Sequence, residues 1–173
     1  PFFVKYQDGK ESIVDKKEET LFRWNTLLGF VWKAFGNKQK HGFYFGQVTN
    51  GVPNGQGFLS LPGGSSYEGG FKDGLMHGSG EMIGIDNGIS VKTIGQFKFD
   101  KANGQSIGIF SNGSFIMGEF REDQPWEAIF FDRNMNILNK IWIDPGGSES
   151  SITNNFEMYG RAMRQLPDSS YII

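Results

Sequence analysis

The residues that could carry out catalysis or bind a metal are few in this sequence. Histidine occurs twice, as His41 and His77, and cysteine is absent. A Ser-His-Asp site needs histidine, and a thiolate nucleophile or metal site needs cysteine. His77 occupies a turn position that holds asparagine elsewhere, and His41 lacks the second histidine of a metal-binding helix. The sequence therefore predicts no metal, no cofactor and no catalytic residue of these kinds.

Short glycine-rich and acidic stretches also lack the context that their chemistry requires. Residues 55–57 and 78–80 read Gly-x-Gly, but neither is followed by Gly-Lys-Ser/Thr or opens a helix that would aim N–H groups at a phosphate. Residues 132–136 have the alternating Asp/Asn spacing of a calcium loop, yet Ile137 stands where the bend needs glycine. We therefore expect a protein that binds and is not an enzyme.

Composition and charge narrow the class of partner. The 173 residues include 17 Lys or Arg and 19 Asp or Glu, a net charge of −2, without a basic tract. Charge-driven nucleic-acid binding therefore has no source. An aromatic content of 15% predicts a packed fold, and no apolar run approaches the roughly 18 residues of a transmembrane helix. Because residue 1 is Pro, we expect a trimmed chain or a mature exported or organelle-imported one.

Glycine is concentrated in the middle of the chain, where it repeats. Of the 25 glycines, 19 lie between Gly42 and Gly118. Gly46, Gly69, Gly95 and Gly118 recur at intervals of 23, 26 and 23 residues, and the residues two positions before them are Tyr44, Tyr67, Thr93 and Ile116. The positions expected to be structural in these repeats are Tyr44, Gly46, Gly55, Gly57, Tyr67, Gly69, Phe71, Gly78, Gly80, Gly95, Phe97, Gly104, Gly118 and Phe120.

Each repeat is interpreted as a two-stranded hairpin. The expected tight turns are Asn54-Gly55, His77-Gly78 and Asn103-Gly104, and the expected closing turns are Gly63-Gly64, Asn87-Gly88 and Asn112-Gly113. Glycine within a strand indicates a close neighbour, and Phe71, Phe97 and Phe120 are expected to supply the rings. Because one hairpin cannot bury its apolar face, the hairpins must stack. The predicted fold is mainly β, an elongated sheet of stacked antiparallel hairpins.

The best-formed unit, Tyr67 to Glu81 (YEGGFKDGLMHGSGE), resembles the MORN repeat family. The resemblance extends over about Gly42 to Ile143 and covers about four repeats. The last two are degenerate, with Thr93 in place of the leading aromatic, Ser106 in place of the second glycine, and Ile116 at the start of the fourth unit. We expect residues 41–143 to form the repeat domain.

The resemblance implies a function in assembly. MORN-like repeats occur in scaffolding and junction proteins, and members of the family are linked to phospholipid headgroups and to homodimers. A non-catalytic protein interaction or scaffold module in a larger assembly is therefore expected, with another protein or a second copy as partner. The alternatives are a peripheral membrane adaptor, which uses the repeats and an N-terminal helix, and an enzyme or enzyme accessory. On the repeats, the expected partner-binding residues are Lys72, Asp73, Lys98 and Arg121.

The flanking segments, residues 1–40 and 144–173, have other patterns. Residues 2–14 are expected to form a hairpin around Asp8-Gly9. From 17 to 35 the apolar residues fall on one helical face, which predicts an amphipathic helix that caps the sheet or docks on a membrane or partner. Trp24, Phe30 and Trp32 are its candidate docking residues. The C-terminal tail is expected to contain a short helix at 155–166.

Overall fold

The computed structural model describes residues 3–7, 10–14, 17–86 and 89–142, and within them it contains strands and no helix. The strands are β1 (Phe3–Gln7), β2 (Lys10–Val14), β3 (Glu18–Thr26), β4 (Gly29–Lys33), β5 (Gly42–Thr49), β6 (Val52–Ser60), β7 (Ser66–Lys72), β8 (Leu75–Asp86), β9 (Ile89–Lys98), β10 (Lys101–Phe110), β11 (Phe115–Arg121), β12 (Gln124–Phe131) and β13 (Ile137–Trp142).

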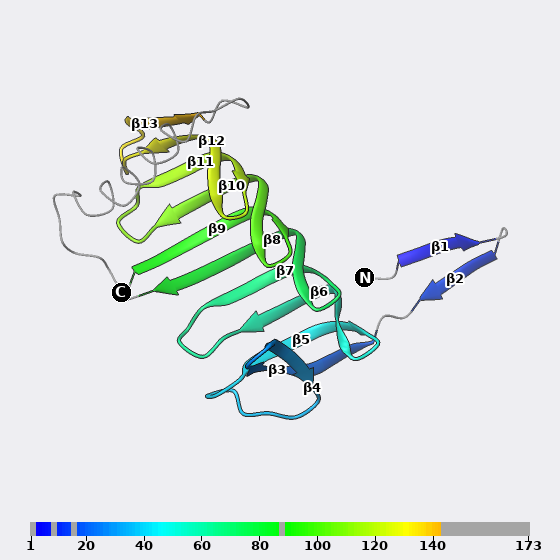
Figure 1. The fold of residues 1–173 in the computed structure, drawn as a ribbon. Coiled ribbons are helices and arrows are strands. Elements are labelled where there is room, and N and C mark those ends of the chain that lie inside the picture. The colour runs from blue at the N-terminus through cyan, green and yellow to red at the C-terminus, as the bar shows by residue number, and fades with distance from the viewer. Residues whose placement is uncertain (1–2, 8–9, 15–16, 87–88, 143–173) are drawn as a thin grey trace.

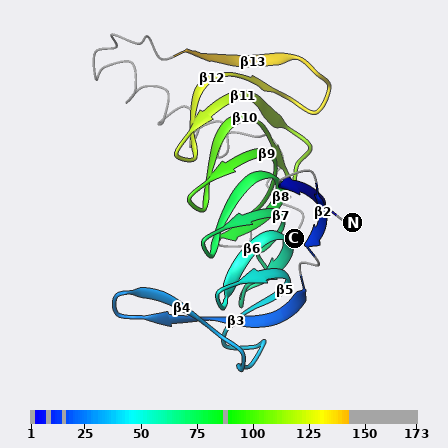
Figure 2. The ribbon, with the colours of Figure 1, turned by 90° about the vertical axis from the view of Figure 1, so that its right-hand side faces the viewer.

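Eleven of these strands form one antiparallel sheet, in which consecutive strands lie side by side except that β5 pairs with β3 and not with β4 (Figure 1). The order is β13 to β5 without interruption, then β3 and β4, while β1 and β2 pair separately. Figure 2 shows the hairpins stacked along the sheet and the β3–β4 hairpin projecting from its end. The expected mainly β fold of stacked antiparallel hairpins is confirmed.

The amphipathic helix expected over residues 17–35 is wrong, because this segment forms β3 and β4. Leu21 pairs with Tyr44 of β5 and is buried, whereas Leu27 and Leu28, on the expected apolar helix face, are fully exposed in the turn. The segment is rich in aromatic and β-branched residues, which suit strands, and β5 offers an open edge to pair with. Pairing across the sheet therefore outweighs a helical spacing. The helix expected at 155–166 lies outside the described residues.

The tight turns lie four residues before the expected positions. Both central residues have positive φ at Phe99-Asp100, for example, with values of +54° and +65°, as a type I′ hairpin turn requires. The four tight turns are Asn50-Gly51, Asp73-Gly74, Phe99-Asp100 and Glu122-Asp123. The sites first expected to turn, Asn54-Gly55, His77-Gly78 and Asn103-Gly104, lie within β6, β8 and β10.

Register shifts in the sheet explain why the expected turn positions lie within strands. Strand pairs β5–β6, β7–β8 and β9–β10 each shift register just beyond their tight turns, and the positive φ of Gly55, Gly78 and Gly104 lies at these irregular segments. Asn-Gly thus marks a bulge as well as a turn. The closing turns at Gly63-Gly64 and Asn112-Gly113 are present as expected, and Asn87-Gly88 lies outside the described residues.

The core lies on one face of the sheet, as a chain of edge-on aromatic contacts. Ring centroids are 5.0 Å apart for Tyr44 and Phe71, 5.2 Å for Phe71 and Tyr67, and 5.0 Å for Tyr67 and Phe97. Trp32 extends the chain to β4 through a contact of 5.7 Å with Tyr44. Such contacts between neighbouring repeats stabilise the stack beyond the area they bury.

Glycines cross five consecutive strands in a straight row, Gly46, Gly57, Gly69, Gly80 and Gly95, each paired with the next. The rings beside this glycine row belong to the leading tyrosines, and not to the phenylalanines expected from the sequence. A Cβ at Gly57 would overlap the ring of Tyr44, and one at Gly80 would overlap that of Tyr67. The row is therefore shaped by tyrosines that pack beneath it.

The tyrosine hydroxyls are anchored to the bulges. The Tyr44 hydroxyl donates to the Gln47 carbonyl oxygen at 2.7 Å, and the Tyr67 hydroxyl donates to that of Gly70 at 3.1 Å. Burial raises the pKa of Tyr67 to about 12, and the charge of Asp100 acts in the same direction. Each hydroxyl thus stays protonated in the folded chain well above neutral pH.

This raised pKa predicts a loss of stability in alkali. The Tyr67 contribution is complete below the ordinary pKa of 10.0 and is lost as the pH rises through the folded value of about 12, because only the unfolded phenol ionises readily. Denaturant titrations across that range, read with the ultraviolet absorbance of tyrosinate, should show the free energy of unfolding falling. Tyr67→Phe should flatten the fall in part, since Tyr44 also has a raised pKa. Equal slopes for variant and parent would contradict the assignment.

Candidate interaction groove

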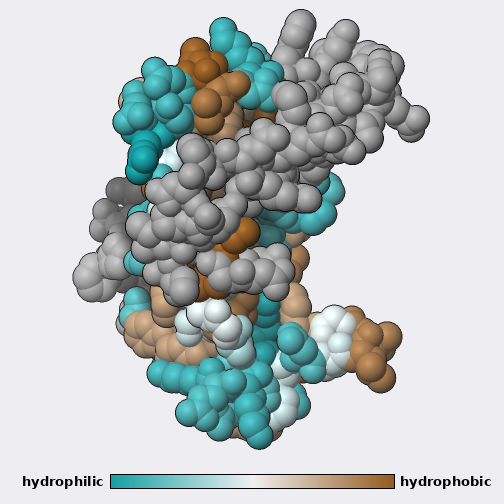
Figure 3. Space-filling view, turned by 90° about the vertical axis from the view of Figure 1, so that its left-hand side faces the viewer, coloured by the Kyte–Doolittle hydropathy of each residue, from teal (hydrophilic) through white to brown (hydrophobic). Residues whose placement is uncertain are grey.

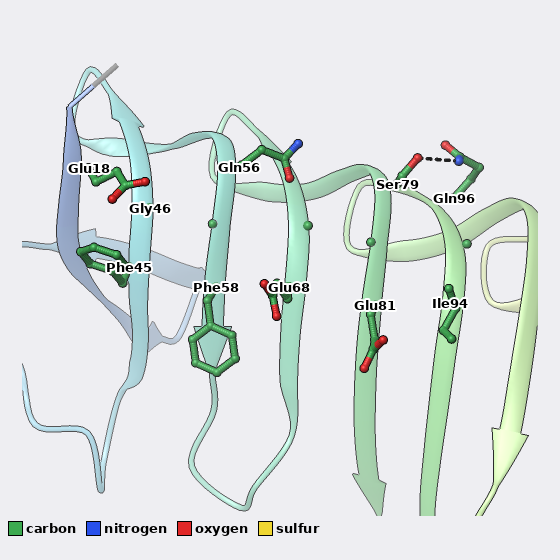
Figure 4. A pocket seen from close by; sticks show the side chains of 14 residues that line it. Glu18, Phe45, Gly46, Gln56, Phe58, Glu68, Ser79, Glu81, Ile94 and Gln96 are labelled. Atoms are coloured by element: carbon green, nitrogen blue, oxygen red, sulfur yellow. Dashed lines mark hydrogen bonds between the residues drawn. The ribbon is translucent and has the colours of Figure 1, made fainter. Parts of the chain in front are cut away.

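The glycine row forms the floor of a groove on the face opposite the core. A trough of about 730 Å³ crosses the strands from β3 and β5 to β9, because the glycine positions face the tyrosines and only the residues on either side of them send side chains to the outer face. Figure 4 shows the trough between two lines of side chains. Its lining residues are Glu18, Phe45, Gly46, Gln56, Gly57, Phe58, Glu68, Gly69, Ser79, Gly80, Glu81, Ile94, Gly95 and Gln96.

One wall of the groove is polar and uncharged. It carries Gln56, Ser79 and Gln96, and the Gln96 amide Nε2 donates to the Ser79 hydroxyl at 2.8 Å (Figure 4). All three side chains are exposed. They can donate hydrogen bonds to the backbone of a bound segment and accept hydrogen bonds from it.

The other wall combines apolar and acidic side chains in one cross-strand row. Phe45 pairs with Phe58, Phe58 with Glu68, Glu68 with Glu81, and Glu81 with Ile94. Phe45 is 47% exposed, and Phe58 and Ile94 are each 38% exposed. Two carboxylates thus stand between apolar side chains on a face open to solvent.

The carboxylates give this wall a negative charge. Like charges directly opposite in a strand pair repel, so Glu68 beside Glu81 is an unfavourable arrangement for folding. Lys92 Nζ lies 2.7 Å from Glu81 Oε1 and offsets part of that repulsion, whereas no ion pair joins Glu68 to another described residue. A cation on a partner would complete the pairing at Glu68.

The same face continues toward the other end of the sheet. A second trough of about 510 Å³ lies between β10 and β13, with Gly118 and Ala128 in its floor. Met117 and Ile129 extend the apolar row, and Glu119 and Glu127 add negative charge. The pattern of troughs flanked by apolar and acidic side chains therefore recurs along this face of the sheet.

The residues considered for catalysis have structural contacts. His41 stacks on Trp24 at 3.6 Å, and its Nδ1 accepts from the Asn37 N–H at 3.0 Å; His77 stands edge-on to Phe99. Hydrogen bonds from Asn136 to the Asp132 carboxylate close the turn at 132–136, and they lower the pKa of Asp132. The described residues contain no group of three or more side chains suited to a metal, and no helix able to span a bilayer.

The charged residues proposed from sequence lie at the tight turns, outside the groove. Lys72 ends β7, Asp73 is the first central residue of the β7–β8 turn, and both are exposed. The Lys98 ammonium lies over the Phe99 ring at 5.5 Å, and Arg121 lies over the Trp126 ring at 4.0 Å. These four residues form a rim at the hairpin ends, which we call the turn rim.

The three candidate docking residues lie on the β3–β4 hairpin, and only one of them reaches the core. Trp32 donates from Nε1 to the Gly74 carbonyl oxygen at 3.3 Å. Trp24 donates from Nε1 to the Phe35 carbonyl oxygen at 2.9 Å. The Arg23 guanidinium lies over the Phe30 ring, 4.6 Å from its centroid. Trp24 and Phe30 therefore remain on the projecting hairpin.

Sequence reasoning missed the groove itself, although its signal is present. Phe45, Phe58, Glu68, Glu81 and Ile94 each stand next to a glycine of the row, and alternation along a strand sends them to the face opposite the tyrosines. Searching for exposed residues beside the repeat glycines would have found them.

Comparison with known proteins agrees with this architecture. Residues 44–66 and 67–89 match the MORN repeat, one unit each. The chain is also 30% identical over 86 residues to Alsin from Rattus norvegicus, Mus musculus and Homo sapiens. That match covers 49% of this chain and 5% of Alsin. The two matched units contain Gly46, Gly57, Gly69 and Gly80, so residues 44–66 and 67–89 are two adjacent MORN repeats that contain most of the glycine row.

Proposed function

We propose that this chain is a non-catalytic protein interaction module, a component of a larger assembly, whose groove binds an extended basic and apolar segment of a partner protein. The observation that carries the proposal is the row Phe58, Glu68, Glu81 and Ile94, in which two carboxylates separate two exposed apolar side chains. The two MORN repeats support an interaction role, and a second copy of the chain is the alternative partner.

The spacing of the row defines the partner segment. Neighbouring strands lie about 4.8 Å apart, so Phe58 and Ile94, three strands apart, are separated by about 14 Å. An extended segment that crosses the strands places alternate side chains about 6.8 Å apart on one side. Apolar residues four positions apart, with Lys or Arg midway, therefore match the row. The polar wall can pair with the backbone of such a segment.

A peptide titration tests this pattern. Two synthetic peptides, apolar-x-Arg-x-apolar and the same peptide with Glu in place of Arg, would be measured by fluorescence anisotropy. We expect the Arg peptide alone to bind, and Glu68→Lys to weaken it at least about tenfold, because the substitution replaces attraction by repulsion. Added salt should weaken binding as well.

Two control variants locate the interface. Glu122→Lys makes the same charge change at an exposed turn outside the groove and should leave binding within about twofold. Lys72→Glu with Lys98→Glu tests the turn rim. Loss of binding in the turn-rim variant, with Glu68→Lys unaffected, would place the interface at the hairpin ends and contradict the groove.

A further inference from the structure

The turn of the β3–β4 hairpin exposes two leucines completely. Leu27 and Leu28 have relative exposures of 104% and 100%, and they occupy the two positions between Thr26 and Gly29. Hairpin turns normally carry Gly, Asn or Asp there, so these leucines have no role in the turn itself. The hairpin stands away from the stack in Figure 2, and an apolar tip protrudes at the lower right of Figure 3.

The polar groups of this turn are largely satisfied within it. The Thr26 hydroxyl accepts from the Leu28 N–H at 3.2 Å and donates to the Gly29 carbonyl oxygen at 3.2 Å. Moving backbone groups out of water is costly when they lack partners. This turn can therefore leave water at a lower cost than an open loop with the same leucines.

Aromatic side chains lie behind the tip. Asn25 pairs with Phe30, and Trp24 with Val31, on the two strands of the hairpin. At about 3.3 Å per residue, these pairs stand roughly 7 to 10 Å behind the leucines. Phe35, which is 65% exposed, packs edge-on against Trp24 at 5.8 Å. Rings of this kind favour the boundary between water and lipid.

Positive charge surrounds the base of the hairpin. Residues 20–67 contain four cations and no Asp or Glu, although the whole chain has a net charge of −2. Lys33 Nζ lies 4.4 Å from the Trp24 ring centroid, and Lys38 Nζ lies 3.5 Å from that of Phe43. Lys38 and Lys40 are exposed on the loop that follows β4. The order from the tip is thus aliphatic, aromatic, cationic, which matches the layers of an anionic bilayer surface.

We propose that the β3–β4 hairpin docks the chain on an anionic lipid bilayer. Leu27 and Leu28 enter the boundary between headgroups and acyl chains, Trp24 lies among the headgroups, and Lys38 and Lys40 contact lipid phosphates. This inference goes beyond the groove, because it concerns a different surface and does not depend on whether the groove binds a partner. A chain docked in this way holds its outer-face groove free for a protein.

Vesicle co-sedimentation tests the docking, with phosphatidylcholine vesicles and with phosphatidylcholine vesicles that contain phosphatidylserine. We expect binding to the anionic vesicles only. Leu27→Ser with Leu28→Ser should lower the partition coefficient at least about tenfold, and Lys38→Glu with Lys40→Glu should lower it by a similar factor and reduce its salt dependence. Phe99→Ser is the matched control, since Phe99 is 61% exposed on a turn at the β9–β10 hairpin; its partition should equal that of the parent.

The leucines are fully exposed, so unchanged thermal melts should accompany their replacement and separate docking from folding. Absence of vesicle binding by the parent chain, or equal loss in Phe99→Ser, would overturn the proposal. A dimer seen by light scattering that disappears in the double leucine variant, without vesicle binding, would assign the tip to a second copy and would also overturn it.

Discussion

Replacing Gly69 by valine should destabilise the fold by about 3 to 5 kcal/mol, enough to unfold much of a marginally stable chain. A Cβ at Gly69 would lie 2.6 Å from the Gly80 Cα and 2.6 Å from the Tyr67 hydroxyl, at a φ of +158°. The nearest atoms belong to backbone and to a buried, hydrogen-bonded ring, so neither can move aside cheaply. Chemical denaturation followed by circular dichroism gives the free energy of unfolding.

Gly84 of the same sheet provides the matched control. A Cβ there would meet its nearest atoms at 3.8 Å and 3.9 Å, which is ordinary van der Waals contact. Gly84→Ala should therefore change the free energy of unfolding by less than about 0.5 kcal/mol, since alanine also suits an extended strand better than glycine does. If Gly69→Val were as mild as Gly84→Ala, the glycine row would not be a packing constraint.

The repeat could be predicted from sequence because its signal is periodic and local. Recurrence of glycine at 23-residue intervals identifies Gly46 and Gly69 as equivalent, and equivalence alone is enough to predict stacked hairpins. The closing turn at Gly63-Gly64 was likewise readable from its residues. These features depend on neighbours along the chain or on the previous repeat.

The β3–β4 hairpin could not be predicted in the same way. Leu21, Trp24 and Leu28 have helical spacing, but Leu21 is buried by the edge of β5, more than twenty residues later in the sequence. The spacing of apolar residues in one segment does not indicate whether a strand elsewhere in the chain has a free edge with which the segment can pair. The same limit applies to the tight turns, where both Asn50-Gly51 and Asn54-Gly55 have turn composition and only the sheet decides which one reverses the chain.

The groove could be predicted from the sequence only in part. Its residues were visible as neighbours of the repeat glycines, yet a sequence does not state that the opposite face remains uncovered. Phe45 and Phe58 are exposed because the tyrosines take the inner side of the glycine row. The charges differ in a related way: Lys72 and Arg121 are conspicuous in the sequence, whereas Glu68 becomes notable only beside its cross-strand neighbour Glu81.

Asp100, in the β9–β10 turn, contacts neighbouring β8 and distant β3, and Asp100→Ala should cost about 2 to 4 kcal/mol. Its carboxylate accepts from the Met76 N–H at 2.7 Å and lies 3.9 Å from Arg23, whose side chain is 18% exposed. Alanine would leave that N–H without its acceptor and the guanidinium without its nearest anion. Alanine is also tolerated less well than aspartate or asparagine at the φ of +65° that residue 100 adopts. Thermal and denaturant unfolding would measure the loss.

Asp100→Asn separates the hydrogen bond from the charge. Asparagine keeps an acceptor for Met76 and tolerates the turn, so we expect a cost below about 1 kcal/mol at neutral pH. Burial raises the pKa of Asp100 above 3.8 and outweighs the hydrogen bond from Met76 and the charge of Arg23. The carboxyl contribution is therefore complete below pH 3.8 and lost as the pH rises through the folded pKa, so the stability difference between parent and Asp100→Asn should widen on acidification. A difference that narrows on acidification would mean that the ion pair with Arg23, and not burial, governs this carboxyl group.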